Sequence, residues 1–189
     1  MKTFQVWKQI QLGKKPSLKG INVSSYAQDM LDKVSYSKKK ETISLMHVKV
    51  SELEIDAKYP TITQIVEKAK ELGLGLCPAE VGPQLREQYQ DQPMNEWLYV
   101  GMEPITDRGG FPGVFRVERS EGGLWLHGSW AGPSSDWSPD SAFVFCLRTL
   151  DSLKPLNPSD LESRVAALEA WRDNFIQAAN EAAKQLQEI

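Results

Sequence analysis

Three side chains near the middle of the chain have the types that acid–base chemistry requires. His127 and Glu118 could exchange protons with a substrate, and Arg116 could stabilise negative charge that develops on it. A small hydrolase or nuclease would use this set as its catalytic residues. Such an enzyme would place His127 and Glu118 in an open cleft within hydrogen-bond reach. Whether the three side chains share a surface depends on how their segments pair.

The segments that carry these residues read as a β-hairpin. Glu121 and Gly122 can form a two-residue loop, which pairs Ser120 with Gly123. Counting outward from the loop separates apolar residues from polar and aromatic ones, and a one-residue slip would mix the two sets. The predicted pairs are Val117 with Leu126, Phe115 with Gly128, Arg116 with His127 and Glu118 with Trp125.

The polar side of this hairpin, extended by a neighbouring strand, forms a predicted recognition surface. Aromatic rings supply flat contact area, and Arg, Glu and His supply directed hydrogen bonds. We therefore expect a non-catalytic binding or protein-interaction protein. In the alternative interpretation another element covers the surface and its charges form a structural pair. We call this surface the aromatic/charged face; its residues are Trp97, Tyr99, Arg116, Glu118, Trp125 and His127.

The other candidate residues are interpreted as structural. Cys77 and Cys146 have no second Cys or His at zinc-ligand spacing and read as buried thiols, and His47 reads as a core residue. No glycine pattern of the kind that cradles phosphate occurs, and the loop over residues 134–140 lacks calcium-ligand spacing. We therefore expect neither a metal nor a cofactor. Trp130 and Trp137 flank that loop and could hold an apolar or sugar-like ligand, or could pin the loop to the sheet.

The net charge of −3 is unevenly distributed. Residues 1–50 contain ten lysines and three acidic residues, a balance of +7. Lysine-rich runs can contact the phosphates of a nucleic acid, and such binding would weaken steeply as salt rises. The alternative is that Lys14, Lys15 and residues 38–40 solvate two loops. The lack of interleaved Arg and aromatic residues favours solvation.

The elements that must position these residues indicate an α+β fold. Residues 1–74 read as a β-α-β-α unit, with strands at 4–12 and 43–50 and helices at 25–34 and 61–72. Capping-box spacing supports both helix starts, at Ser25 with Gln28 and at Thr61 with Gln64. Pro83 opens a short helix. Strands at 97–103, 114–120, 123–130 and 142–150 predict an antiparallel meander of about four strands.

A long helix is predicted over residues 159–189. Apolar residues recur there at alternating spacings of three and four, which is typical of a coiled-coil-like stripe. This helix could join a partner protein or a second copy of the chain, or pack on its own sheet. Residues 1–150 would form the α+β core, either as one unit or as two subunits of structure at 1–74 and 75–150.

The composition indicates a cytoplasmic protein. No apolar run approaches the roughly 18 residues of a membrane-spanning helix, and the first residues lack a secretory pattern. Two cysteines are too few for a disulfide framework. We therefore expect no membrane contact.

Several segments resemble a family of uncharacterised bacterial proteins. The similarity covers residues 4 to about 148 and is most specific over residues 72–89, LGLGLCPAEVGPQLREQY. It continues with Glu96-Trp-Leu, Met102-Glu-Pro-Ile and Val114-Phe-Arg-Val-Glu118. The resemblance implies a bacterial origin and transfers no activity and no catalytic residue. The predicted C-terminal helix would be an addition to the shared pattern.

Overall fold

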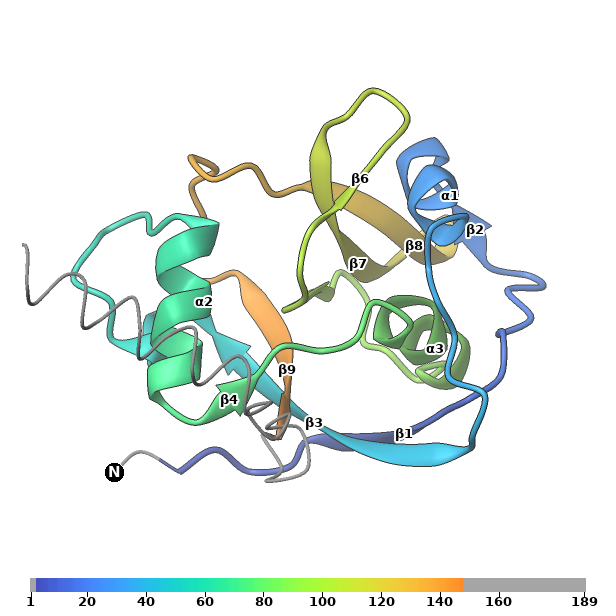
Figure 1. Cartoon of the computed structure of the whole chain (residues 1–189), viewed down its shortest axis with the longest axis horizontal. Helices are drawn as coiled ribbons and strands as arrows, with labels where there is room; N and C mark the ends of the chain where they lie inside the picture. The colour runs from blue at the N-terminus through green and yellow to red at the C-terminus, as the bar shows by residue number, and fades with distance from the viewer. Residues whose placement is uncertain (1–2, 148–189) are drawn as a thin grey trace, which may run out of the picture. The chain divides into compact units, whose positions relative to one another are not determined.

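The computed structural model describes residues 3–147, and residues 1–148 cluster as one compact unit. One nine-stranded sheet dominates this unit and curls into a half-barrel (Figure 1). The helical segments are α1 (Ser25–Leu31), the 3-10 helix η1 (Val50–Leu53), α2 (Ile62–Glu71) and α3 (Val81–Gln88). The strands are β1 (Lys8–Leu12), β2 (Asn22–Val23), β3 (Glu41–Lys49), β4 (Leu74–Gly75), β5 (Trp97–Val100), β6 (Ile105–Thr106), β7 (Pro112–Ser120), β8 (Gly123–Trp130) and β9 (Ala142–Leu147).

The sheet topology corrects the predicted α+β arrangement. Strand order is β1-β3-β9-β5-β7-β8-β2, with β4 against β9 and β6 against β7. The predicted β-α-β-α unit and separate antiparallel meander are wrong, because one sheet includes strands from both halves of the described chain. Antiparallel pairs join β5, β7 and β8, as expected of a meander, but β9 lies parallel to β5 and β2 lies parallel to β8. The sheet is therefore mixed.

Strand β9 shows why the predicted meander is wrong. Its sequence, Ala-Phe-Val-Phe-Cys-Leu, is buried at every position except Leu147. A strand that is apolar on both faces needs cover on both faces, which suits the middle of a sheet. Pairing with β3 on one edge and with β5 and β4 on the other provides that position.

The helical content is also lower than predicted. The described residues contain three short α-helices and no coiled-coil-like helix, so the sheet-rich description replaces that expectation. The helix predicted at 159–189 lies outside the described residues. None of the described helices has the length and apolar character to cross a membrane.

The sequence predicted a capping box at the start of each of two helices. One is confirmed, and at the other the N-cap is a different residue. At α2, Thr61 and Gln64 form the predicted capping box, and Gly73 follows the helix with a φ of 83°. At α1 the N-cap is Ser24, not Ser25. The backbone of Ser24 is extended, as an N-cap requires, and its hydroxyl accepts a hydrogen bond from the Ala27 N–H at 3.2 Å.

Helix α3 packs against β1, β7 and β8, and in Figure 1 the sheet curls around it. Its polar side chains hold neighbouring backbone in place. The Gln88 amide accepts from the N–H of Gln11 at 2.8 Å and donates to its carbonyl at 2.9 Å. Glu87 accepts from the backbone N–H of Ser17 at 2.7 Å. These bonds fix the loop after β1 to the helix.

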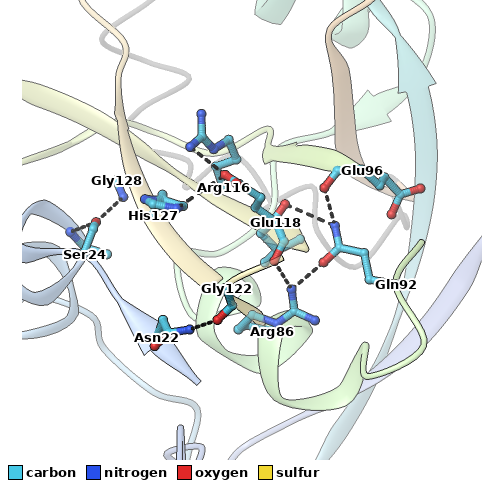
Figure 2. Close-up of polar contacts among 12 residues, drawn as sticks. Asn22, Ser24, Arg86, Gln92, Glu96, Arg116, Glu118, Gly122, His127 and Gly128 are labelled. Atoms are coloured by element: carbon cyan, nitrogen blue, oxygen red, sulfur yellow. Dashed lines mark hydrogen bonds and ion pairs between the residues drawn. The ribbon is translucent and has the colours of Figure 1, made fainter. Parts of the chain in front are cut away.

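Arg86 is the largest fully buried side chain among the described residues, and Figure 2 shows its hydrogen bonds. Its Nη1 donates to the carbonyl of Glu118 at 3.1 Å and to the Gln92 amide oxygen, and its Nη2 donates to the carbonyl of Tyr89. Burial lowers the pKa of Arg86 to about 10, so it keeps its charge at neutral pH. The Gln92 amide donates to the carbonyl of Glu96 at 3.0 Å. Helix α3 is thereby tied to strand β7.

Gly82 provides a test of the packing between α3 and the sheet. A Cβ at this position would lie 2.5 Å from Cγ of Phe115, inside a close contact. Overpacking typically costs about 1–3 kcal/mol, whereas alanine gains roughly 1 kcal/mol over glycine in a helix. We therefore expect Gly82→Ala to destabilise the protein by about 1–2 kcal/mol and to lower its melting temperature by about 2–8 °C.

Gly122→Ala is the matched control for this substitution. Gly122 lies outside the left-handed region, and the nearest neighbour of its Cβ would be Trp125 Nε1 at 3.3 Å. Thermal unfolding measures the melting temperature of both variants. A Gly82→Ala protein as stable as the wild type would show that α3 does not pack against Phe115 in this way.

Candidate ligand-binding site

The pairing of β5, β7 and β8 builds the aromatic/charged face as predicted. Strand β8 pairs Ser120 with Gly123, Arg116 with His127 and Glu118 with Trp125, which confirms the predicted hairpin register. Strand β5 places Trp97 beside Glu118 and Tyr99 beside Arg116. Two rows of three side chains result: Trp97, Glu118 and Trp125 in one, and Tyr99, Arg116 and His127 in the other.

The turn that sets this register differs in one detail from the prediction. The left-handed backbone falls at Gly123, with a φ of 104°, and not in the two-residue loop before it. Hairpin loops that end in a G1 bulge have glycine at this position. The Asn22 amide donates to the carbonyl of Gly122 at 2.8 Å, which ties the turn to β2 (Figure 2).

Arg116 is at the centre of the face and is held on two sides. Its Nη2 donates to Glu118 Oε2 at 2.9 Å. Its guanidinium lies over the ring of Trp97, 4.5 Å from the centroid, a distance at which cation–π attraction operates. Its Nε is buried and has no hydrogen-bond partner among the described residues. Arg116 is therefore fixed in place with one donor unpaired.

His127 lies next to this ion pair. Its Nε2 is 3.4 Å from Glu118 Oε2, and its ring stacks on Trp125 with centroids 5.0 Å apart and planes 12° apart. Burial, followed by the positive charge of Arg116, lowers the pKa of His127, and Glu118 opposes them. The imidazole is consequently neutral at neutral pH. Figure 2 shows Arg116, Glu118 and His127 side by side on β7 and β8.

The geometry brings the predicted catalytic residues together without completing a catalytic centre. Glu118 shares its carboxylate between Arg116 and His127, so the ion pair offsets much of its charge. Within residues 3–147, no Ser, Thr or Cys side chain hydrogen-bonds to His127, and no group of three metal-ligating side chains occurs. A neutral His127 could still act as a base. The hydrolase hypothesis remains a prediction.

A polar cavity of about 480 Å³ adjoins Arg116. Strands β5, β7 and β8 form one wall, and the loop over residues 131–141 forms the other. The backbone N–H of Trp137 donates to the carbonyl of Pro60 at 3.0 Å, and Asp136 bridges to Thr61 at the start of α2. The lining residues are Tyr99, Arg116, Ser129, Trp130, Ser135, Asp136, Trp137, Ser138 and Ser141.

Two residues of the loop wall have a buried polar atom with no hydrogen-bond partner among the described residues. They are Ser135 Oγ and Trp137 Nε1, whereas the unpaired Arg116 Nε belongs to the strand wall, and all three atoms are inaccessible to solvent. Ser135 and Trp137 are only 8% and 6% exposed. Most buried polar groups in proteins are hydrogen-bonded, because an unpaired one costs about 1–3 kcal/mol. The three unpaired atoms are therefore a local cost to stability, as are Tyr36 Oη, Glu80 Oε2 and Arg86 Nε elsewhere in the described residues.

The sequence indicated this loop but not its polar role. Trp137 packs edge-on against Tyr99 and Phe143, with centroids 4.6 Å and 4.9 Å away, so it pins the loop to the sheet as one prediction allowed. Trp130 is 59% exposed at the cavity rim and remains free to contact a ligand. Ser135 was not identified from the sequence. The sequence signal that could have identified it is the pair Ser134 and Ser135 between Trp130 and Trp137.

A second cavity of about 430 Å³ shares Ser129 and Trp130 with the polar one. Its lining is mainly apolar, with Tyr26 and Phe111 exposed beside Trp130. Gly128 lies on its floor, where a Cβ would come within 2.9 Å of the Met30 sulfur. The ring of Trp130 thus borders one polar and one apolar cavity.

The remaining candidates have structural surroundings. Cys77 and Cys146 are buried with their sulfurs 2.8 Å apart, and burial raises the pKa of the Cys77 thiol well above its usual value. His47 is half-buried, with its ring 5.6 Å from that of Trp7. The two thiols are therefore buried side chains, as predicted.

The two lysine-rich loops come together at one end of the β1–β3 pair. A Cβ on Gly13 would meet the backbone of Lys39 and Lys40, so the loops are in contact there. The side chains of Lys14, Lys15, Lys19 and residues 38–40 are exposed. Binding of a nucleic acid at this basic corner remains a prediction.

Comparisons with protein-family models, curated proteins and solved structures find no match to the chain. The resemblance of residues 4–148 to a bacterial family therefore stays a prediction. Any function must be inferred from the site itself.

The ionisation of His127 tests the electrostatics of the face. We expect an NMR titration to give His127 a pKa below its ordinary 6.5. Glu118→Gln should lower this pKa further, and Arg116→Gln should raise it, because the two charges act in opposite directions. A higher pKa of His127 in Glu118→Gln, or a lower one in Arg116→Gln, would show that the three side chains do not adjoin as described.

The same pKa shift makes stability depend on pH. Because the native pKa is the lower one, the unfolded chain takes up the proton first as the pH falls. The contribution of His127 is thus complete above about pH 6.5, the unfolded value, and is lost as the pH falls through the native pKa. Urea unfolding between pH 7.5 and 5 should show this loss, and His127→Gln should reduce it.

Proposed function

We propose that the protein is a non-catalytic binding protein that holds a small polar ligand beside Arg116. The observation that carries the proposal is the polar cavity whose lining includes Arg116, a partly exposed guanidinium that Glu118 and Trp97 already hold in place. The cavity volume of about 480 Å³ is within the usual range for small-molecule sites, about 300–1,000 Å³.

The arrangement around Arg116 favours binding because it is preorganised. The ion pair with Glu118 and the contact with Trp97 fix the guanidinium before any ligand arrives. A side chain that is already ordered loses little entropy on binding. The side chain of Arg116 is 18% exposed, so no element among residues 3–147 fully covers it.

The proposal is non-catalytic because the site lacks a complete set of reacting groups. Glu118 is engaged by a cation, and one face of the His127 ring is covered by Trp125. Nucleophilic catalysis would require a nucleophile hydrogen-bonded to its base, and no such pair involves His127 in the described part of the chain. These features support recognition over chemistry.

A thermal-shift screen of soluble metabolites tests the proposed function. A ligand at 100 times its Kd stabilises the folded state by about 2.7 kcal/mol, which raises the melting temperature by about 5–11 °C. Arg116→Gln removes a charged hydrogen bond worth about 1.5–3 kcal/mol. We expect the variant to lose at least half of the temperature rise produced by each true ligand.

Arg108→Gln is the matched control, because Arg108 is an exposed arginine paired with Asp29 away from the cavity lining. It should respond to each ligand as the wild type does. Equal temperature rises in the wild type and in Arg116→Gln, or no rise with any compound, would contradict the proposal.

A further inference from the structure

The two cysteines of the chain lie next to each other in the sheet. Cys77 and Cys146 are 69 residues apart in the sequence, yet the thiol of Cys146 donates to the sulfur of Cys77 at 2.8 Å. Both are free and buried. A disulfide bond holds its sulfurs about 2.0 Å apart, so a movement of less than about 1 Å would join these two. The pair therefore has the proximity that disulfide formation requires.

Two strand pairings position the sulfurs. Strand β4 pairs Gly75 with Cys146 on β9, and Cys77 follows two residues later, where β5 replaces β4 beside β9. The backbone N–H of Cys77 donates to the carbonyl of Gly101 at 2.7 Å, and the N–H of Gly101 donates to the carbonyl of Val144 at 2.9 Å. The Cys77 thiol also donates to the Val144 carbonyl at 3.6 Å. These bonds hold Cys77 against β9, beside Cys146.

Metal binding is the other chemistry that two adjacent thiols could share. Structural zinc takes four protein ligands, and no group of three metal-ligating side chains occurs among residues 3–147. Oxidation to a disulfide needs only the two thiols and an oxidant. It is therefore the chemistry that this pair can carry out without another side chain.

We propose that Cys77 and Cys146 are a reversible oxidation site, at which a small disulfide such as oxidised glutathione joins them. Neither residue lines the cavity beside Arg116, so the inference is independent of the proposed function. The thiolate of Cys146 attacks the small disulfide, forms a mixed disulfide and releases one thiol. The thiolate of Cys77 then attacks the Cys146 sulfur and releases the second. Two protein thiols are oxidised, the small disulfide is reduced to two thiols, and the two protons pass to the released thiolates.

The position of Cys146 decides where the reaction starts. Burial, followed by the hydrogen bond with Cys146, raises the pKa of Cys77 well above its usual value, so few Cys77 side chains are in the reactive thiolate form. Cys146 precedes Leu147, which is 48% exposed at the end of β9, and its neighbour β4 has only two residues. Separation of β4 from β9 is a local opening that exposes Cys146 without unfolding the rest of the sheet.

Thiol counting on the full-length protein tests the inference. The reduced protein is incubated with mixtures of reduced and oxidised glutathione, and the same mixtures are applied during refolding from urea, when burial cannot block access. N-ethylmaleimide then labels the free thiols in denaturant, and the intact mass gives the number of labels. We expect two labels in the reducing mixtures, and neither a label nor an attached glutathione in the oxidising ones. Dithiothreitol should restore both labels.

The melting temperature shows whether the bond fits the native sheet. We expect the oxidised protein to melt about 4–16 °C above the reduced one, which is the usual effect of a disulfide in a chain of this length. Cys77→Ala and Cys146→Ala should each abolish this rise, and either variant suffices if the other does not fold. Cys77→Ala should also keep one attached glutathione, because no second thiol is present to displace it.

The contrary outcomes are equally specific. Two labels at every glutathione ratio in both arms, or glutathione attached to both cysteines in place of the bond, would overturn the inference. A lower melting temperature of the oxidised protein would do the same, because the native sheet would then not accommodate the bond. So would a rise that persists in an alanine variant. None of these results bears on the ligand-induced stabilisation that tests the proposed function through Arg116→Gln.

Discussion

The buried guanidinium of Arg86 is the constraint on which this arrangement depends. A buried charge is costly unless hydrogen bonds satisfy it, and helix α3 places this one inside the curl of the sheet. Backbone carbonyls of Tyr89 and Glu118, together with the Gln92 amide, satisfy two of its nitrogens. These acceptors lie on three different segments, so the geometry of α3, of the loop that follows it and of β7 must agree. A shift of any one would remove an acceptor from a guanidinium whose Nε already has no partner among the described residues.

Glu118 links the buried Arg86 to the candidate site. Its carbonyl accepts from Arg86 on the α3 side, and its carboxylate accepts from Arg116 on the other side of the sheet. Arg86 therefore fixes the backbone of Glu118, and Arg116 fixes its side chain. This dual role argues against Glu118 as a mobile proton donor and favours it as the anchor of Arg116. In the proposed function the aromatic/charged face is an ordered recognition surface, with its charges balanced before a ligand enters.

The sequence predicted local structure better than it predicted topology. The register of the β7–β8 hairpin followed from a turn and an alternation that are both contained in residues 114–130, and the start of α2 followed from Thr61 and Gln64. The neighbours of β9 could not be derived in this way, because pairing with β3 and β5 depends on packing between segments far apart in the chain. Its uninterrupted apolar sequence was a usable signal of a central strand.

The residues of the candidate site also differ in whether the sequence alone could place them. Residues on adjacent strands, Arg116, Glu118 and His127, could be placed from the hairpin alone. Ser135 and Asp136 could not, because their position depends on a loop that reaches from β8 to the start of α2. The α+β prediction assigned these parts to separate units. All lining residues of the cavity come from residues 99–141, and Pro60 and Thr61 of the first half hold its loop in place.

A crystal structure of the full-length protein, at a resolution that shows ordered water, tests the central claim most directly. The account predicts ordered water or a bound small molecule in the cavity, within hydrogen-bond distance of the Arg116 guanidinium. A loop over residues 131–141 that closes onto the sheet and leaves no room for water or a ligand beside Arg116 would contradict it.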